Sequence, residues 1–311
     1  MKEILLIAGL PAAGKTTLVQ EFVSKGYFRI NRDSLGGDLN SQVLEVKKAF
    51  GNGIMKVVLD NTYVTVEQRA PIIEYAKANK ITIGCLFMGT TMEEAQFNVT
   101  SRMVKKHGKL LSLNEMKLTK DPGNFPPAAL YAAKKNLIRP TITEGFNYVK
   151  IAPFIRNANK EYKNKAIIFD YDGTLRTTKS GAKFPTDPND VIVLPGRKEK
   201  LAELKKAGWI ILGASNQSGI GKGDLTEETA KACFKRTNDL LGMHIDVKYC
   251  PHSVPPIICY CRKPSPGMGV EFIEEHKLNP SECIFVGDMT SDATFAKRCG
   301  FQFQSADQFF K

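Results

Sequence analysis

The sequence predicts an α/β fold with two doubly wound parallel-sheet domains. Short buried-strand patterns alternate with amphipathic segments of helical length, the alternation occurs twice, and the polar stretch RNANKEYKNK separates the two series. Repeated βα alternation is the pattern of a parallel sheet covered by helices. A length of 311 residues is ample for two domains. We therefore predict one domain over residues 1–155 and a second over residues 156–311.

The first series contains three strand signals. They are runs of apolar and β-branched residues at Ile4–Ala8, Val57–Asp60 and Ile81–Phe87. A glycine-rich loop follows the first run, and an amphipathic helix begins near Lys15. These runs have the length of buried strands, and the segments between them are long enough for helices.

The second series begins directly after the polar stretch. Ala166–Phe169 is a new apolar strand, and further strands are predicted at Ile210–Ala214 and Ile284–Gly287. The helical segments of this series are Lys198–Ala207, Thr226–Leu241 and Gly267–His276. The order of these elements again predicts a parallel sheet with helices on its faces.

Composition and charge restrict the class of protein. No apolar run approaches the roughly 18 to 20 residues of a membrane span, so no membrane partner is expected. The start MKEILLIAGLPAAGK runs directly into a glycine loop, which is typical of a buried strand and not of a signal peptide. Seven cysteines and four histidines without a leader indicate reduced or metal-bound thiols, and we expect a cytoplasmic protein.

The formal net charge is +12 at pH 7. Residues 1–155 hold 21 basic and 13 acidic residues, and the remainder holds 23 and 19, so the excess lies mainly in the first half. A basic surface suits a polyanionic partner such as nucleic acid, because lysine and arginine neutralise phosphates. A solubilising lysine surface explains the same charge.

A phosphate-binding loop is predicted between the first strand and the first helix. The segment GLPAAGKT, residues 9–16, matches the pattern G-x-x-x-x-G-K-[ST]. In such a loop backbone N–H groups surround the phosphates, Lys15 reaches the β and γ phosphates, and the Thr16 hydroxyl binds Mg²⁺. The residues expected to bind ATP are Gly9, Ala12, Ala13, Gly14, Lys15, Thr16 and Thr17.

Two carboxylates of the first domain are candidates for the acceptor side of the reaction. Asp33 follows a short apolar segment after the first helix, and Asp60 ends a predicted strand. Strand ends in such sheets face the ligand crevice. Asp33 could accept the proton of an attacking hydroxyl, although a turn or helix-cap role fits the residue alone equally well.

The segments NRDSLG, DNT with Arg69 seven residues after Thr62, and TITEGFNYVKI closely resemble the kinase domain of polynucleotide kinase 3′-phosphatases. The resemblance covers most of residues 1–155. It implies that Asp33 is the general base, that Lys15 and Thr16 hold ATP and Mg²⁺, and that Asp60 lies beside the acceptor hydroxyl. Asn61 and Arg69 are the further substrate-binding candidates of this domain.

The sequence departs from this family in the segment that supplies a lid arginine. Gln96 and Phe97 stand where arginines are usual. Arg102 is then the best candidate for stabilising the transferring phosphoryl group, and Lys105 or Lys106 would lack the guanidinium fork.

The second domain carries a paired-aspartate motif at the end of its first strand. The residues FDYDGTL, 169–175, resemble the DxDGT signature of the haloacid-dehalogenase superfamily, whose phosphotransferases use an aspartate nucleophile. Two carboxylates two residues apart can act as a pair. Asp170 would attack phosphorus, and Asp172 would protonate the leaving oxygen and then activate water.

The remaining parts of that superfamily's site occur in the expected order. By resemblance, Ser215 and Lys263 hold the phosphate oxygens, and Asn216 lies beside them as a substrate-binding candidate. Asp170, the carbonyl of Asp172 and Asp288 would bind Mg²⁺, with Asp292 in support. The segments KSGAKFPTDPNDVIVLPG and SNQSGIGKG resemble both animal polynucleotide phosphatases and the histidinol-phosphate and heptose-bisphosphate phosphatases. Neither group carries a large cap, which would leave an open cleft.

A zinc site is predicted in the loop before Lys263. Cys250, His252, Cys259 and Cys261 form a C-x-H and C-x-C set, and three thiolates with one imidazole make a closed tetrahedral zinc site. The alternative is that these cysteines are small buried side chains. Heptose-bisphosphate-type enzymes carry such a loop with a longer insertion, and animal polynucleotide phosphatases do not.

Other conspicuous side chains are assigned to packing or the surface. Four cysteines in apolar stretches and four aromatic residues near the C-terminus are expected in the core: Cys85, Cys233, Cys283, Cys299, Phe301, Phe303, Phe309 and Phe310. The aromatic set would otherwise be a platform for stacking bases. His107, His244 and His276 are not expected to be catalytic.

Together these features predict a bifunctional enzyme that repairs nucleic-acid ends. It would transfer the ATP γ-phosphate to a 5′-hydroxyl and hydrolyse a 3′-phosphate, making DNA or RNA ends fit for a ligase of the same pathway. The expected cofactors are ATP, Mg²⁺ and structural Zn²⁺. The alternative is a small-metabolite kinase fused to a histidinol-phosphate or heptose-bisphosphate phosphatase, which the zinc loop favours and the kinase-half resemblance disfavours.

Overall fold

The computed structural model describes residues 1–31, 41–157, 159–255 and 258–311. The chain forms two compact units. Unit 1 comprises Met1–Val99 and Thr119–Arg156, and unit 2 comprises Thr100–Leu118 and Asn157–Lys311. The predicted division at residues 155 and 156 therefore differs in one segment, because residues 100–118 belong to unit 2.

Contacts inside unit 2 explain this assignment. The Leu110 backbone N–H donates to Glu271 Oε1 at 3.1 Å, and Lys105 Nζ lies 3.5 Å from Glu274 Oε1. Both glutamates lie on the helix α11 (Gly267–Glu275). The sequence of residues 100–118 does not indicate which of the two units this segment packs against.

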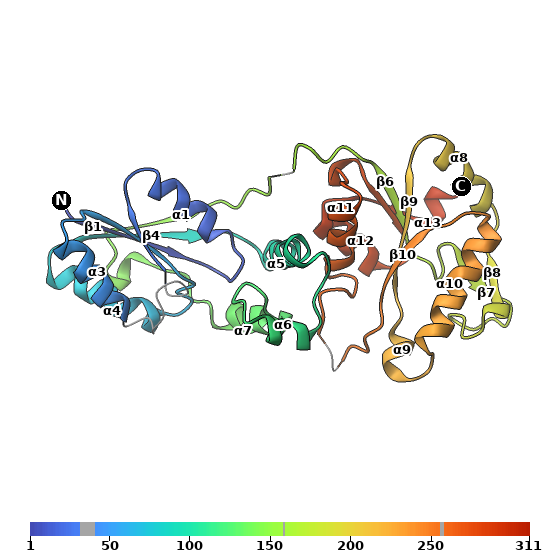
Figure 1. Ribbon diagram of the computed structural model, residues 1–311, viewed down its shortest axis with the longest axis horizontal. Coiled ribbons are helices and arrows are strands. Elements are labelled where there is room, and N and C mark those ends of the chain that lie inside the picture. The colour runs from blue at the N-terminus through green and yellow to red at the C-terminus, as the bar shows by residue number, and fades with distance from the viewer. Residues whose placement is uncertain (32–40, 158, 256–257) are drawn as a thin grey trace. The chain divides into compact units, whose positions relative to one another are not determined.

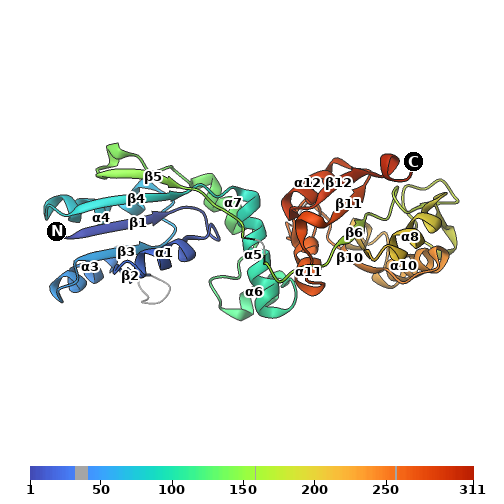
Figure 2. The same ribbon diagram turned by 90° about the horizontal axis from the view of Figure 1, so that it is seen from above.

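Unit 1 is built on a five-stranded parallel sheet with the order β2-β3-β1-β4-β5 (Figure 2). Its strands are β1 (Glu3–Ala8), β2 (Phe28–Ile30), β3 (Lys56–Asp60), β4 (Thr82–Met88) and β5 (Tyr148–Ala152). The three predicted strands are confirmed as the central ones. Both edge strands went unpredicted, since β2 has only three residues and β5 is partly exposed.

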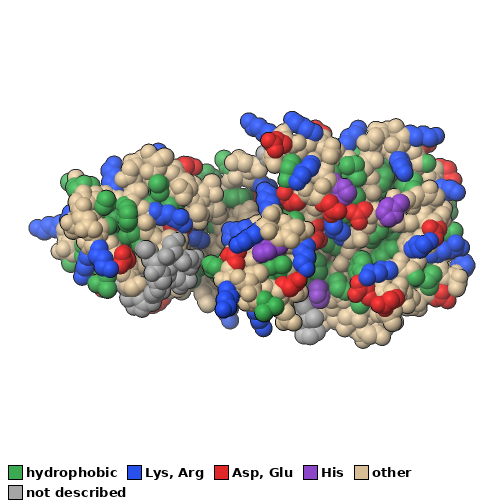
Figure 3. Space-filling view, in the orientation of Figure 1, with side chains coloured by type: hydrophobic (Ala, Val, Ile, Leu, Met, Phe, Trp, Pro, Cys, Tyr) green, Lys and Arg blue, Asp and Glu red, His purple; other side chains and the backbone are tan. Residues whose placement is uncertain are grey.

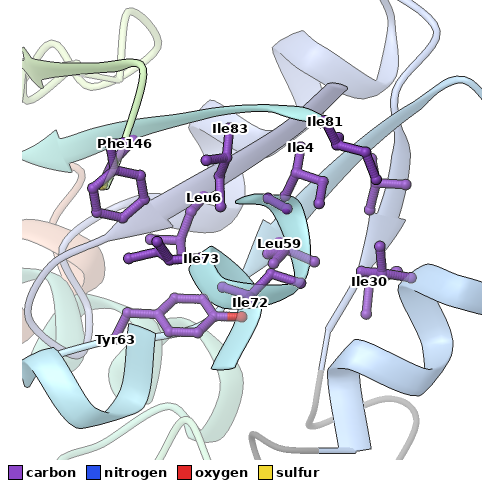
Figure 4. Packing of buried hydrophobic residues seen from close by; sticks show 14 of the residues in the cluster. Ile4, Leu6, Ile30, Leu59, Tyr63, Ile72, Ile73, Ile81, Ile83 and Phe146 are labelled. Carbon is purple, nitrogen blue, oxygen red and sulfur yellow. The ribbon is translucent and has the colours of Figure 1, made fainter. Parts of the chain in front are cut away.

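The helices of unit 1 cover both faces of its sheet. They are α1 (Lys15–Val23), α3 (Ser41–Gly51), α4 (Val66–Ala78), the first half of α5 (Met92–His107), α7 (Pro127–Asn136) and the 3₁₀ turn η1 (Ile142–Glu144). The second half of α5 and all but the last residue of α6 (Leu113–Thr119) belong to unit 2. Figure 1 shows α1 on one side of the strands and α3 and α4 on the other. On the α4 side, Ile4, Leu6 and Leu59 of the sheet pack against Ile72 and Ile73 (Figure 4). This core holds the strand ends that carry the predicted ATP site.

Unit 2 contains a second five-stranded parallel sheet with the order β10-β9-β6-β11-β12. Its strands are β6 (Ala166–Phe169), β9 (Ile210–Asn216), β10 (Asp246–Cys250), β11 (Ile284–Gly287) and β12 (Gln302–Ser305). The predicted strands are β6, β9 and β11, which form the centre. A small antiparallel hairpin of β7 (Arg176–Thr178) and β8 (Val191–Val193) follows β6.

The helices of unit 2 also lie on both sides of its sheet. They are α8 (Arg197–Lys206), α9 (Ser218–Lys222), α10 (Glu227–Leu241), α11, α12 (Thr290–Cys299) and α13 (Ala306–Phe309), with 3₁₀ turns η2 (Pro188–Asp190) and η3 (Pro280–Glu282). Figure 1 shows α11 and α12 on one side and α8 and α10 on the other. The predicted fold class, two doubly wound parallel-sheet domains, is thus confirmed.

The residues assigned to packing are mostly buried as expected. Cys85, Cys233, Cys283 and Cys299 are fully buried. Phe301 is also buried, and Phe309 and Phe310 pack against the core of unit 2. Phe303 is exposed on the edge strand β12, so the prediction that it lies in the core is wrong. The aromatic residues at the C-terminus are therefore mainly packing residues.

Charged side chains are dispersed on the face seen in Figure 3. Lysine and arginine side chains there are interspersed with aspartate and glutamate and do not gather in one patch. Among the residues that the structure describes, none of the helices combines the length and the apolar character that crossing a membrane requires.

Candidate functional sites

The glycine loop of unit 1 joins β1 to α1 in a conformation suited to phosphate binding. Gly9 and Gly14 have φ of 147° and 89°, and Ala12 has φ of 58°, so the loop turns its backbone through conformations that L-residues rarely adopt. Lys15 is buried, and its Nζ donates to the carbonyl oxygens of Gly9 at 3.2 Å and Leu10 at 2.7 Å. Thr16 is exposed and available to a ligand.

Two side chains from the β4–α5 region fasten this loop. Thr90 Oγ1 donates to the carbonyl of Ala13 at 2.7 Å, and Asn98 Nδ2 donates to the carbonyl of Ala12 at 2.8 Å. The remaining predicted loop residue, Thr17, is exposed at the start of α1. These bonds hold the loop through its carbonyl groups, and backbone N–H groups are the donors with which such a loop binds an anion.

Asp60 ends β3 beside the loop and is almost completely buried. The Thr16 hydroxyl donates to its Oδ2 at 3.3 Å, and Arg29 donates to the same oxygen from Nε at 3.0 Å and Nη2 at 2.6 Å. A hydroxyl and a carboxylate in this arrangement are the ligand types that hold Mg²⁺ near nucleotide phosphates. The sequence did not single out Arg29, because an arginine on a short edge strand carries no recognisable signal.

Asn61 is buried beside Asp60. Its Nδ2 has no hydrogen-bond partner among the residues that the structure describes. Asp33, the predicted base, lies outside the described residues. Its role therefore stays a prediction, and the role of Asn61 in substrate binding does too.

Arg69 does not take the predicted place at the substrate. Its side chain is completely buried, and Nε and Nη2 donate to Glu144 at 2.7 and 2.8 Å. Nη1 donates to the carbonyls of Tyr63 and Ile138. The guanidinium ties α4 to η1, and a structural role replaces the expected substrate contact.

The lid segment departs from the family pattern in the way the sequence indicated. Gln96 is buried with its Nε2 donating to Tyr131 Oη at 3.2 Å, and Phe97 is buried under the guanidinium of Arg156 at 3.6 Å. Both side chains are therefore packed inside unit 1. Arg102 is exposed on the half of α5 that belongs to unit 2, and its role as the lid arginine stays a prediction.

The site of unit 2 lies at the carboxyl ends of β6, β9 and β11. Asp170 follows β6, and its backbone N–H donates to the carbonyl of Val286 on β11 at 2.9 Å. Lys263 Nζ lies 2.7 Å from Asp170 Oδ1 and 2.8 Å from Asp292 Oδ1. Three sequence-predicted residues from distant segments thus meet in one buried cluster.

Burial dominates the electrostatics of this cluster. Loss of solvent raises the pKa of Asp170 to about 6, against the opposing effect of the Lys263 ammonium. Burial also raises the pKa of Asp288, and the nearby Asp292 adds to that shift. A group of carboxylates that resists ionisation is a site where a cation is stabilising.

The acidic residues fit a magnesium ion. Oxygen atoms of Asp170, Asp288 and Asp292 lie within 4.8 Å of one another. Gly173 has φ of 84°, and a Cβ there would lie 3.1 Å from Cγ of Asp288, so only glycine lets that carboxylate approach. An all-oxygen donor set is the type that Mg²⁺ prefers.

Ser215 and Asn216 end β9 next to this cluster. Ser215 is fully buried, and its Oγ accepts a hydrogen bond from Gln217 Nε2 at 2.9 Å. The Asn216 amide pairs with the backbone of Lys263, accepting from its N–H and donating to its carbonyl, both at 3.0 Å. Asn216 therefore positions the Lys263 backbone, and its role in substrate binding stays a prediction.

Asp172 is held at both carboxylate oxygens. Arg176 Nε donates to Oδ1 at 2.7 Å, and Gln217 Nε2 donates to Oδ2 at 2.9 Å. Sequence reasoning missed both partners. Arg176 lies four residues after Asp172, a spacing with no meaning in a loop, and Gln217 was visible only as part of the SNQSG segment.

The predicted zinc ligands come together. Cys259 Sγ lies 3.6 Å from Cys250 Sγ and 3.4 Å from Cys261 Sγ. His252 Nδ1 lies 3.3 Å from Cys261 Sγ and 3.5 Å from Cys250 Sγ. Ligands around tetrahedral zinc are about 3.6 Å apart, given Zn–S near 2.3 Å and Zn–N near 2.0 Å. Hydrogen bonds from the Cys250 and Cys261 thiols lower the pKa of Cys259, which favours a thiolate.

Unit 2 has a parallel sheet with paired aspartates at its carboxyl edge and a buried lysine beside them, which defines a phosphatase with an aspartate-centred site. Through unit 2 the chain belongs to the haloacid-dehalogenase-like phosphatases. More narrowly, residues 165–310 match the family described as polynucleotide kinase 3 phosphatase. This match lies in the second half of the chain.

Individual relatives carry two kinds of name. A probable D-glycero-D-manno-heptose-1,7-bisphosphate 7-phosphatase of Thermoplasma volcanium is 34% identical over 145 residues, which cover 45% of this chain and 97% of that protein. A bifunctional polynucleotide phosphatase/kinase of Schizosaccharomyces pombe is 30% identical over 157 residues, 49% of this chain and 34% of that protein.

Among solved structures, the D,D-heptose 1,7-bisphosphate phosphatase from B. bronchiseptica, complexed with magnesium and phosphate, is 29% identical. The match covers 45% of this chain and 79% of that one, with a TM-score of 0.41.

Proposed function

We propose that the chain is a bifunctional enzyme of nucleic-acid end repair, which phosphorylates 5′-hydroxyl ends with ATP and removes 3′-phosphates. The observation that carries this proposal is the combination of two sites in one chain. Unit 1 has a phosphate loop with Thr16 bonded to Asp60, and unit 2 matches a polynucleotide phosphatase family. The two activities together would leave ends that a ligase can join.

In unit 1, the loop N–H groups and Lys15 would bind the ATP phosphates, with Thr16 and Asp60 on the magnesium side. Bound Mg²⁺ would neutralise charge on the transferring phosphoryl group. Asp33 would take the proton from the 5′-hydroxyl as its oxygen attacks the γ-phosphorus. Arg102 is the proposed lid arginine.

In unit 2, a carboxylate oxygen of Asp170 would attack the 3′-phosphate, and the bond from phosphorus to the 3′ oxygen would break. Asp172 would give its proton to the leaving oxygen. A water molecule would then attack the aspartyl-phosphate while Asp172 takes its proton, releasing inorganic phosphate. Ser215 and Lys263 would hold the phosphate oxygens, and Asp170, Asp288 and the Asp172 carbonyl would bind Mg²⁺, with Asp292 in support.

A structural zinc ion held by Cys250, His252, Cys259 and Cys261 is part of the proposal. The loop that these residues close leads directly to Arg262 and Lys263. Because Asn216 also binds the Lys263 backbone, zinc would fix the same segment from its other side.

A small-metabolite phosphatase is the second candidate, and the thiol cluster favours it. The test is to incubate the pure protein with Mg²⁺ and γ-labelled ATP on an oligonucleotide with a 5′-hydroxyl and a 3′-phosphate, as DNA and as RNA. Label at the 5′ end with loss of the 3′-phosphate supports end repair. Failure on both, with hydrolysis of heptose bisphosphate or histidinol phosphate, supports the second candidate.

Variants then assign each activity to its unit. Lys15→Ala should abolish phosphorylation and leave dephosphorylation intact, because Lys15 belongs only to the loop of unit 1. Asp170→Asn should do the reverse. Loss of both activities in either variant would contradict two separate sites.

A further inference from the structure

Arg176 is one of the largest fully buried side chains of unit 2, with 1% of it exposed. A buried guanidinium is costly unless it is paired and hydrogen-bonded. Here it forms an ion pair with Asp172, in which Nε lies 2.7 Å from Oδ1. The side chain therefore places a permanent cation directly behind a residue proposed to act as acid and base.

Helix α10 holds the guanidinium in one orientation. Nη1 donates to Thr237 Oγ1 at 3.2 Å, and that hydroxyl donates in turn to the carbonyl of Cys233 at 2.8 Å. The guanidinium carbon lies 4.8 Å from the ring centroid of Phe234 and 5.3 Å from that of Tyr171. A lysine could supply the charge but not both hydrogen bonds, because its ammonium lacks the planar fork.

The opposite oxygen of Asp172 has a different environment. Gln217 Nε2 bridges Asp172 Oδ2 and Ser215 Oγ, at 2.9 Å from each. Ser215 is a proposed phosphate-binding residue, so Oδ2 is on the substrate side. Each carboxyl oxygen has two lone pairs, and Oδ2 can therefore keep the bond from Gln217 while it carries a proton.

We propose that Arg176 is a positioning residue for the phosphatase reaction. It fixes Oδ1 of Asp172, so that Oδ2 is the oxygen that gives the proton to the leaving group and later takes one from water. This inference rests on the proposed roles of Asp170 and Asp172. In the first step the Asp170–phosphorus bond forms, the ester bond breaks, and the proton of Oδ2 goes to the ester oxygen; in the second, water replaces Asp170 and Oδ2 regains a proton.

The test compares two substrates that differ in their need for a proton. The nitrophenolate of p-nitrophenyl phosphate leaves readily without one, whereas an alkyl ester such as thymidine 3′-phosphate must have its leaving oxygen protonated. Arg176→Met should lower kcat/KM on the alkyl ester by roughly 10²-fold more than on p-nitrophenyl phosphate, the typical size of a general-acid contribution. The ratio kcat/KM is compared because it covers the steps up to departure of the leaving group and leaves out hydrolysis of the aspartyl-phosphate, which is common to both substrates. Arg176→Lys should restore part of that difference.

Asp172→Asn removes the acid itself and should show the largest loss on the alkyl ester relative to p-nitrophenyl phosphate. Arg197→Met is the matched control. Arg197 also stacks on an aromatic ring, 4.1 Å from the Phe310 centroid, but its donors go to the carbonyls of Thr174 and Pro195. We expect it to leave the ratio of the two rates unchanged. If the wild type prefers a sugar phosphate, that substrate replaces the nucleotide, since it too is an alkyl ester. The role of Arg176 can therefore be tested even if the proposed end-repair function is wrong.

An equal loss on both substrates in Arg176→Met, while Asp172→Asn discriminates, would overturn the positioning role. Equal losses in Asp172→Asn would overturn it as well, together with the acid role of Asp172. If Arg176→Met does not fold, as monitored by the fluorescence of the single tryptophan, Thr237→Val replaces it. A smaller selective loss in that variant supports the proposal, and a loss without selectivity refutes it.

Discussion

At the scale of single residues, both sites depend on side chains and backbone conformations that a motif does not specify. Ala12 occupies a left-handed conformation inside the phosphate loop, where its Cβ is unfavourable by about 1–2 kcal/mol. Arg29 and Arg176 each pair with an aspartate of a predicted site. Neither arginine is part of the pattern by which its site is recognised.

Ala12→Gly should stabilise unit 1 by about 1 kcal/mol, because glycine adopts positive φ without steric cost. Hydrogen exchange of the amides in β1 and β3 measures this without interference from unit 2. Lys80→Gly is the matched control, since Lys80 has φ of 52° after α4 and lies outside the loop. Slower exchange for the control but not for Ala12→Gly would show that the loop conformation is not strained.

Sequence reasoning located the chemistry better than it located the partners of each group. The positions of Asp60 and Asp170 follow from where strands end, and a strand end is visible in the sequence. Lys15 follows from the glycine-loop pattern, and Lys263 from the family resemblance of its segment. The contacts of Arg69 are set by segments far away in the chain, so the sequence predicted a substrate contact where the structure has an internal ion pair with Glu144. Asp33 lies outside the described residues, and its role keeps the status of a prediction.

At the scale of elements, buried polar pairs join segments that would otherwise be held only by apolar packing. The Arg69–Glu144 pair joins α4 to η1, and its side chains are 0% and 8% exposed. The central strands were predictable because they are uniformly apolar. The edge strands were not, because β2 is very short and every residue of β5 is partly or fully exposed.

Arg69→Met should destabilise unit 1 by about 3–5 kcal/mol, because it leaves Glu144 as a buried charge without its cation. The double variant Arg69→Met, Glu144→Leu should recover much of this loss. Urea unfolding followed by circular dichroism gives the free energy of unfolding. Phosphatase activity should persist in both variants. If Arg69→Met lowers the free energy of unfolding no more than the double variant does, the ion pair is not stabilising.

The loop between β10 and Lys263 offers a second test at this scale. If zinc binds the thiol cluster, a chelator should expose three reactive thiols, those of Cys250, Cys259 and Cys261, while the four buried cysteines outside the cluster stay unreactive. It should also lower the thermal midpoint of unit 2. Thiol titration with and without chelator measures the change. Three reactive thiols in the metal-loaded protein would contradict a closed zinc site.

At the scale of the whole molecule, the unfolding of the two units can be followed separately by spectroscopy. The only tryptophan, Trp209, packs against the core of unit 2, so its fluorescence follows the unfolding of that unit alone. Residues 100–118 also belong to this unit. The sequence predicted two domains and placed their border at the polar stretch, but it could not show that an earlier segment crosses over.

A fragment of residues 157–311 should unfold at a lower urea concentration than the same unit in the full chain, with a loss of about 1–3 kcal/mol. The fragment lacks the apolar contacts of Leu110 and the ion pair from Lys105 to Glu274. Tryptophan fluorescence is the measurement. Leu110→Ala in the full chain should show part of the same loss, and an unchanged midpoint in the fragment would mean that residues 100–118 contribute nothing.

The crossing of residues 100–118 also bears on how such a chain can arise and be recombined. The polypeptide passes between the units three times, after Val99, Leu118 and Arg156. A genetic exchange at the polar stretch would separate the second unit from part of its own surface. The two halves are therefore not independent domains joined end to end. A functional fusion must include residues 100–118 together with unit 2.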